Sequence, residues 1–169
     1  MAETKTPLDY KVESERQMAG RIARAWREIR RGFANNALRE LIFEGEEYSI
    51  EAGQFDTLEQ LVLHESIRMG DLADVLRVDP STATRAVQRL IKDGLAEKVS
   101  HSGDGRVVYV APTKRGHDLF KWVVARRSDV VMNVVGELSD DRREGIAVAL
   151  EEFAVALDNA VSRLLHDKR

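Results

Sequence analysis

The chain has 169 residues, of which 43% are hydrophobic and 33% are charged, and its formal net charge is −3. This length allows one sizeable core with appendages. The acidic balance means that any nucleic-acid binding must come from a local basic patch. The absence of cysteine excludes disulfides, thiolate metal sites and thiol redox sensing. No apolar run approaches the roughly 20 residues that span a membrane, and the first residues lack the apolar segment of a signal peptide. We therefore expect a soluble cytoplasmic protein.

The N-terminal part of the sequence predicts an arm followed by one long helix. Residues 1–14 mix Thr, Lys, Pro and Glu, as mobile or docking arms do, and Tyr10 and Val12 could tie this arm down. Residues 15–44 predict a helix, because apolar residues recur along it at helical spacings. A helix of this length is hard to bury in a small domain, so its apolar side is expected to pack on a partner subunit or on the C-terminal helices. The alternative is a surface helix that covers its own domain. Gly32 marks an expected kink or close contact. The apolar residues are Ile22, Trp26, Ile29, Phe33 and Leu41.

Two short helices follow an acidic loop at 45–53. The first is predicted from Phe55 to about Ile67 and the second from Gly70 to Val78, joined by a short turn to the next element. Two short helices, a tight turn and a further helix make the helix-turn-helix layout. The residues expected to face inward are Phe55, Leu58, Leu61, Val62 and Glu65 in the first helix, and Leu72, Ala73, Val75 and Leu76 in the second.

The segment from Asp79 to Gly94 predicts a helix with clear ends and two distinct faces. Asp79 suits the N-cap, Pro80 the first helical position and Gly94 a left-handed stop. The outward face carries hydroxyls, then arginine and glutamine, and no acid until Asp93. Such side chains can donate to base edges and hold phosphates, although most amphipathic helices are ordinary solvated surface. The inward residues are Ala83, Ala86, Val87, Leu90 and Ile91. The outward and edge residues are Ser81, Thr82, Thr84, Arg85, Gln88, Arg89 and Lys92.

A β-hairpin is predicted immediately after this helix. The runs 95–100 and 106–111 are β-prone, and His101-Ser-Gly-Asp-Gly105 between them carries the Asp-Gly turn signal. A hairpin directly behind a helix-turn-helix is a wing. We place Asp104 and Arg106 at its tip, where an arginine can enter a narrow minor groove and the aspartate has a structural use.

Two helices complete the chain. Thr113 is a plausible N-cap for a helix from Lys114 to about Glu137, and Ser139 for a helix that runs to the C-terminus, with Asp140 and Asp141 at its positive end. The first carries an apolar stripe through Leu119, Val123, Val130 and Val134, widened by Phe120, Val124 and Val131. The second has a near-heptad apolar seam, which is typical of helix–helix interfaces. The seam comprises Ile146, Leu150, Phe153, Leu157, Ala160 or Val161, and Leu164.

These elements predict a mainly α-helical fold with a small β-hairpin wing. A winged helix-turn-helix region at 54–113 is flanked by helical dimerisation regions at 15–44 and 114–169, and the three form one integrated domain behind the arm. The candidate dimerisation residues are Ile22, Trp26, Phe153, Leu157 and Leu164.

Several of these residues resemble the pattern of the MarR (multiple antibiotic resistance regulator) family of winged-helix transcription factors. They are Leu72-Ala73, Pro80-Ser-Thr-Ala-Thr-Arg85, Leu90, Gly94-Leu95, Asp104-Gly-Arg106 and Val110-Ala-Pro-Thr113, with Pro112 where the family usually has an aliphatic residue. The resemblance covers roughly residues 16–165. It implies an obligate homodimer, operator binding through the helix at 79–94 and the wing, and a ligand-responsive crevice. A repressor released by a small-molecule effector is the expected form.

Local charge agrees with DNA binding. From Pro80 to Arg115 there are seven basic and three acidic residues, a net of +4 within an acidic chain. Such a patch favours specific docking on DNA, because counterions are released where it meets phosphate. Arg85 is the candidate for a bidentate guanine contact and Gln88 for adenine. Arg89 and Lys92 are candidates for phosphate contacts, and Ser81, Thr82 and Thr84 for base edges or nearby phosphates.

Other functions find little support in the sequence. The four histidines, His64, His101, His117 and His166, have no metal-ligand spacing, so no metal or other cofactor is expected. No nucleophile or phosphate-loop motif points to an enzyme. Trp26 and Trp122 could line a ligand crevice but are more often core or interface residues. The rival interpretation is a winged-helix protein-interaction module without specific DNA binding. This interpretation predicts that any affinity for DNA depends weakly on salt and that the protein has no operator.

Overall fold

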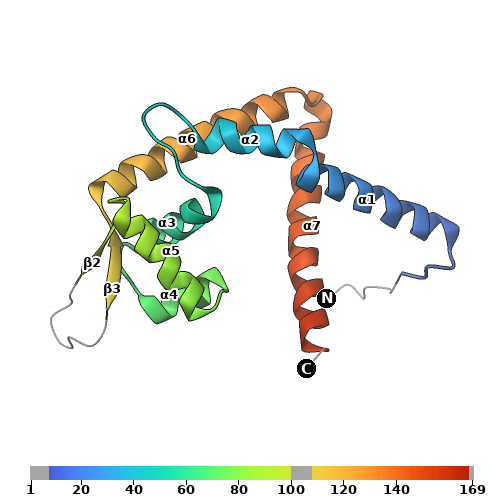
Figure 1. Ribbon diagram of the computed structural model, residues 1–169. Helices are drawn as coiled ribbons and strands as arrows, with labels where there is room; N and C mark the ends of the chain where they lie inside the picture. Colours follow the sequence, from blue (N-terminus) through green and yellow to red (C-terminus); the bar gives the residue numbers. More distant parts are fainter. Residues whose placement is uncertain (1–7, 100–107, 168–169) are drawn as a thin grey trace. The chain divides into compact units, whose positions relative to one another are not determined.

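The computed structural model describes residues 8–99 and 108–167, and the observed fold is mainly α-helical with one small sheet, as predicted. The elements in order are α1 (Glu13–Arg31), α2 (Phe33–Phe43), α3 (Ala52–His64), β1 (Ile67–Arg68), α4 (Met69–Leu76), α5 (Pro80–Lys92), β2 (Ala96–Val99), β3 (Tyr109–Pro112), α6 (Lys114–Gly136) and α7 (Asp140–His166). The chain divides into two compact units, Met1–Val124 and Ala125–Arg169. Figure 1 shows α3, α4 and α5 grouped beside the hairpin of β2 and β3 within the first unit.

The expected single helix over residues 15–44 is wrong, because the chain breaks at Gly32 into α1 and α2. Gly32 has an extended backbone with ψ 159°, and a Cβ there would lie 2.5 Å from the carbonyl oxygen of Glu28. Its own N–H donates to that same oxygen at 2.7 Å. Asn35 donates its side-chain amide to the carbonyl of Arg30 at 3.2 Å. The glycine thus combines the kink and the close contact expected of it, and the two bonds satisfy carbonyls at the end of α1.

The core of the first unit is built by α3, α4, α5, β3 and α6. Phe55 lies at its centre, with its ring 5.6 Å from that of Phe43 and stacked 5.8 Å from that of Phe120. These two ring contacts link α3 to α2 and to α6. The largest fully buried side chains are Phe55, Leu58, Leu61, Leu72, Leu90, Val110 and Val123.

Two residues expected to face inward are exposed. Val75 on α4 is 41% exposed, because α4 is only eight residues long and buries Leu72 and Ala73. Glu65 is also exposed, since α3 ends at His64 and Glu65 adopts a positive φ of 56°. The helix therefore stops before the position that the periodic pattern assigns to its inner edge. Val62 and Leu76 are half-buried.

The sheet has three antiparallel strands in the order β1-β3-β2. The pairing of β2 with β3 confirms the predicted hairpin, with Ala96 opposite Pro112 and Val99 opposite Tyr109. The sequence did not predict β1, whose Ile67 and Arg68 pair with Val110 and Tyr109. Residues 100–107, which contain the predicted wing tip, lie outside the described residues.

Thr113 joins the end of α5 to the start of α6. Its hydroxyl accepts the N–H of Gly116 at 3.1 Å, which is the predicted capping contact. The same hydroxyl donates to the carbonyl of Gly94 at 2.7 Å, and the Thr113 N–H donates to the carbonyl of Leu95 at 3.0 Å. These three bonds fix the beginning of α6 against the stop of the preceding helix.

The second unit contains the end of α6 and all of α7. Ser139 occupies the N-cap position of α7, but its side chain makes no capping bond. Arg143 instead pairs with Asp140 at 2.7 Å and donates to the carbonyl of Val135 at 3.1 Å. No residue of α7 is buried in the single chain. In the part of the chain that is described, no helix is long and apolar enough to cross a membrane.

Candidate nucleic-acid interface

The site begins with the way α5 is capped. The carboxylate of Asp79 accepts the N–H groups of Ser81 and Thr82, both at 3.0 Å, and also their hydroxyls at 2.5 and 2.6 Å. These bonds, those from the two hydroxyls most of all, hold the pKa of Asp79 well below its usual range. At the other end Gly94 takes the left-handed conformation, with φ 70°. Both ends of this helix are therefore as the sequence predicts.

The two faces of α5 also separate as predicted. Ala83, Val87 and Leu90 are at most 2% exposed and fasten the helix to the core. Ala86 and Ile91 are half-buried. The opposite face is open to solvent, so the structure brings the described candidate residues together on one helix. The exposed residues are Ser81, Thr82, Thr84, Arg85, Gln88, Arg89 and Lys92.

The hydroxyl protons on this face are already used within the helix. Ser81 and Thr82 donate theirs to Asp79, and Thr84 donates its proton to the carbonyl of Pro80 at 2.7 Å. A carboxylate and a carbonyl can only accept, so the direction of each bond is fixed by chemistry. The three oxygens are left with lone pairs toward solvent. They can accept hydrogen bonds from a ligand without rearrangement.

Positive charge is distributed unevenly around the helix. Arg89 lies loosely near Glu51, with 3.9 Å between Nη1 and the carboxylate. Lys114, part of the basic segment, pairs with Asp118 at 2.6 Å. Hydrogen bonding and charge attraction within this pair raise the pKa of Lys114 and lower the pKa of Asp118. Lys114 is thus compensated locally, whereas Arg85 and Lys92 of α5 are exposed.

Only part of the wing lies among the described residues. The predicted contacts Asp104 and Arg106 lie outside the described residues. On β1, sequence reasoning missed the exposed Arg68, whose Nε donates to the hydroxyl of Tyr109 at 2.8 Å. A strand of two residues is too short to leave a periodic signal.

The candidate dimerisation residues expose apolar surface in the single chain. On α1, Ile22 is 45% exposed and Trp26 is half-buried, with the guanidinium of Arg30 5.8 Å from its ring centroid. On α7, Phe153 and Leu157 are half-buried and Leu164 is 62% exposed.

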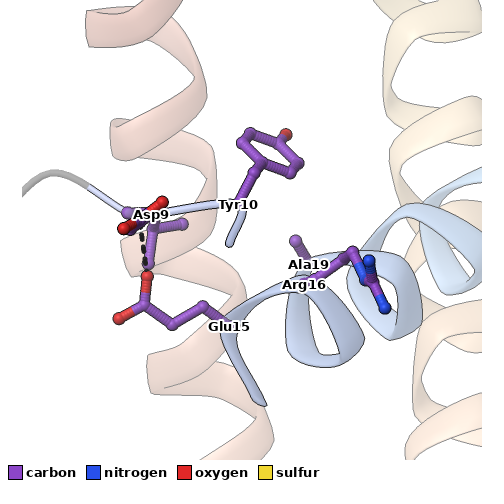
Figure 2. Close-up of a pocket in the computed structure, with 6 residues that line it drawn as sticks. Asp9, Tyr10, Glu15, Arg16 and Ala19 are labelled. Carbon is purple, nitrogen blue, oxygen red and sulfur yellow. Dashed lines mark hydrogen bonds between the residues drawn. The ribbon is translucent and has the colours of Figure 1, made fainter. Parts of the chain in front are cut away.

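Two concave regions are candidates for ligand sites. The first lies against the N-terminal arm, where Asp9 donates its N–H to Glu15 at 2.6 Å (Figure 2). Its volume of about 10 Å³ holds at most a water molecule, and Tyr10 beside it is 75% exposed and does not tie the arm down. The second is a groove of about 450 Å³, whose lining includes Tyr48, Ile50, Lys92, Asp93, Leu95 and Arg115.

Neither tryptophan lines these two regions. Trp122 packs with its ring 5.7 Å from that of Tyr48 and against Gly45, where a Cβ would lie 2.6 Å from it. Among the residues that the structure describes, no group of three His, Cys, Asp or Glu side chains could hold a metal ion. His101 lies outside this part of the chain.

Comparison with known proteins relates this part of the chain to a protein family. The model of the MarR family matches residues 50–108, which contain α3, β1, α4, α5 and β2. An uncharacterised HTH-type transcriptional regulator of Mycobacterium leprae, ML2140, is 25% identical over 122 residues, which cover 72% of this chain and 85% of that protein. The HTH-type transcriptional repressor MdtR of Bacillus subtilis is 24% identical over 102 residues, covering 60% of this chain and 66% of the repressor.

A solved structure extends the likeness in fold beyond the matched segment. Streptococcus pneumoniae FabT, solved in complex with DNA, superposes with a TM-score of 0.71 over 84% of this chain and 99% of FabT, at 19% identity. That likeness concerns the fold. The family match itself covers α3, β1, α4, α5 and β2 and ends before β3. The region from α3 to β2 is thus similar to the MarR family of winged helix-turn-helix transcriptional regulators.

Proposed function

We propose that this regulator binds a pseudo-palindromic DNA operator sequence-specifically, as a homodimer, and represses transcription until a small-molecule effector releases it. The observation that carries DNA binding is the open face of α5, where Arg85, Gln88, Arg89 and Lys92 are all exposed and no acid intervenes between Asp79 and Asp93. A helix of this composition, held rigidly by a buried opposite face, suits the major groove. The complex of FabT with DNA supports a DNA partner for the same fold. The cytoplasm, where such an operator lies, is the expected location.

Within the major groove, we assign base reading to the middle of α5 and phosphate contacts to its C-terminal end. Arg85 has the length and the fork for the O6 and N7 atoms of guanine, and the amide of Gln88 suits adenine. Arg89 and Lys92 lie one turn later and suit phosphates. These roles follow the chemistry of each side chain and its exposed position.

The hydroxyls of Ser81, Thr82 and Thr84 suit fewer kinds of DNA contact than their residue types alone allow. Because Ser81, Thr82 and Thr84 give their protons to Asp79 and Pro80, each offers an acceptor. Phosphate oxygens are acceptors too and gain nothing there. The amino groups of cytosine and adenine, which donate in the major groove, are the complementary partners. We therefore assign these hydroxyls to base edges.

The wing is assigned to the minor groove. Arg106 would enter it where it is narrow, and Asp104 would shape the turn. Both residues lie outside the described residues, so this assignment rests on the sequence pattern.

The homodimer rests on apolar surface that a single chain leaves open. The seam of α7 exposes Leu150, Val161 and Leu164 by 45–62%, and α1 exposes Ile22. Side chains of this kind at heptad spacing pack against a second helix. A twofold assembly would present two copies of α5 to two half-sites about one helical turn apart.

Repression and release have separate support. The similarity to the repressor MdtR favours repression. The groove of about 450 Å³ is a candidate effector site, because its lining offers cations (Lys92 and Arg115) and acids (Glu47 and Asp93) that could bind a small polar molecule. Lys92 is also the last residue of α5, so a ligand there would contact the recognition helix directly.

The test is selection of DNA from a random duplex pool by the purified full chain, followed by binding titrations at several salt concentrations. We expect a motif with dyad symmetry and affinity that falls steeply with salt. Arg85→Ala should weaken binding by about 1–3 kcal/mol and flatten one position in each half-site. A protein-interaction module would select no motif. Enrichment of sequences without symmetry would contradict the proposed dimer docking.

A further inference from the structure

Arg68 lies where the sheet, the wing and the helix-turn-helix meet. It forms β1 with Ile67, pairs with Tyr109 of β3, and is also the N-cap residue of α4. The next residue, Met69, donates its N–H to the carbonyl of Val108 at 3.3 Å. Val108 is the first described residue after the wing. One short segment therefore ties the base of the wing to the start of the helix-turn-helix.

The side chain of Arg68 points away from the core. Its neighbour Ile67 is 7% exposed and Val110, opposite Ile67, is fully buried. Side chains alternate between the two faces of a strand, so Arg68 and Tyr109 share the other face, where Arg68 is exposed and Tyr109 half-buried.

Tyr109 fixes the position of this guanidinium. Its hydroxyl accepts the Nε–H of Arg68 at 2.8 Å, and its ring centroid lies 5.5 Å from Cζ. The two contacts restrain a side chain that otherwise has many rotamers, which reduces the entropy lost on binding a ligand. The planar fork matches phosphate geometry.

We propose that Arg68 contacts the DNA phosphate backbone between the groove read by α5 and the groove entered by the wing, with Tyr109 as its positioning residue. The inference rests on the proposed function. When a recognition helix occupies the major groove and a wing the neighbouring minor groove, one DNA strand must pass between them. The junction of β1 with α4 and the base of β3 is the protein surface that joins these two elements.

The experiment compares variants on a duplex that the wild-type protein selects from a random pool. Arg68→Ala should weaken binding roughly tenfold and reduce the slope of log affinity against log salt by about one. Arg68→Gln keeps a long polar side chain that can still bond Tyr109, and it should lose the same slope while preserving the fold. Tyr109→Phe should weaken binding less and leave the slope unchanged, because the charge remains. Arg142→Ala, an exposed arginine of α7 outside the winged region, is the matched control for lost charge.

A phosphate scan locates the contact. Neutral methylphosphonates are placed singly along each strand of the selected duplex. We expect one substitution per half-site, between the core and the flank of the motif, that weakens the wild type but has no effect on Arg68→Gln. If Arg68→Ala and Arg68→Gln bind like Arg142→Ala at every salt concentration, Arg68 only pins β1 to β3 and the inference is wrong. If the wild type selects no duplex, the proposed function itself fails, and the inference with it.

Discussion

Replacing Gly116 by alanine tests the joint between the winged region and α6. Gly116 is buried in the first turn of α6, and a Cβ there would lie 2.2 Å from the carbonyl oxygen of Leu95 and 3.2 Å from Cδ1 of Leu58. Carbon and oxygen atoms that are not bonded stay roughly 3.3 Å apart. The start of α6 would therefore have to move by about 1 Å. The neighbouring atom is backbone, so no side-chain rotation can relieve the clash.

Three effects determine how far Gly116→Ala changes the free energy of unfolding. Crowding a packed interior costs about 1–3 kcal/mol. The shift also weakens the bond from the Thr113 N–H to the carbonyl of Leu95, now 3.0 Å long, which is worth about 0.5–1.5 kcal/mol. Alanine offsets part of this, because it favours a helix over glycine by about 1 kcal/mol. We expect a net loss of about 2 kcal/mol, or about 5 °C in melting temperature.

The assay is urea unfolding together with a thermal melt, each run at one protein concentration because a dimer's stability depends on it. Gly53→Ala is the control: Gly53 is an exposed helical glycine of the same unit, and a Cβ there would have nothing within 4 Å. It should leave stability unchanged or raise it slightly. Equal stability of Gly116→Ala and the wild type would refute the steric reasoning.

Three further changes test the assembly, the cap and the wing. Leu157→Glu on α7 should convert a dimer into a species near 19.1 kDa by light scattering, because a carboxylate disrupts the apolar seam; a persisting dimer would show that the seam is misassigned. Asp79→Ala should lower the melting temperature at neutral pH. Since the folded-state pKa of Asp79 is depressed, its contribution is complete above the ordinary value of 3.8 and is lost at lower pH, so the difference from wild type should shrink as pH falls below 3.8; a difference that is independent of pH would exclude the charged cap. Arg106→Ala should preserve the core of the selected motif but lose its preference for A·T-rich flanks, and unchanged flanks would contradict the wing assignment.

Helix α5 is predictable because its signals are local. Asp79, Pro80 and Gly94 each act within a few residues of their own position, and the amphipathic period between them depends on no distant contact. The same holds for the capping role of Thr113. Residue identities alone therefore locate both ends of α5 and its open face.

Strand β1 is not predictable for the opposite reason. Its two residues gain strand geometry from β3, and the bonded pair Arg68 and Tyr109 is separated by 41 positions. The tight turn before it, in which Ser66 donates to the carbonyl of His64, uses the positive φ of Glu65. Helical periodicity continues through such a turn in the sequence, which is why the pattern places Glu65 wrongly on the inner edge of the helix.

For the candidate site, the sequence identifies the side chains but not how their protons are shared. From residue type alone, Ser81 and Thr82 could each donate to DNA, whereas in the structure their hydroxyls are bonded to Asp79. Thr84 turns back to Pro80 in the same way. These contacts depend on rotamers, and residue type does not determine a rotamer.

Because of the Asp79 cap, the first turn of α5 differs in hydrogen-bonding character from the rest of its open face. The N-terminus of a helix ordinarily attracts phosphate through its dipole and its open N–H groups, but here the carboxylate of Asp79 already occupies two of those N–H groups. Phosphate is disfavoured at that end by charge as well as by geometry. Acceptor oxygens therefore lie in the first turn, and donors follow from Arg85 to Lys92. In the proposed complex, a half-site that fits this order would place amino groups of cytosine or adenine beside the first turn, guanine beside Arg85 and its backbone beside the C-terminal end. The capping residue would then help to set the orientation of each half-site.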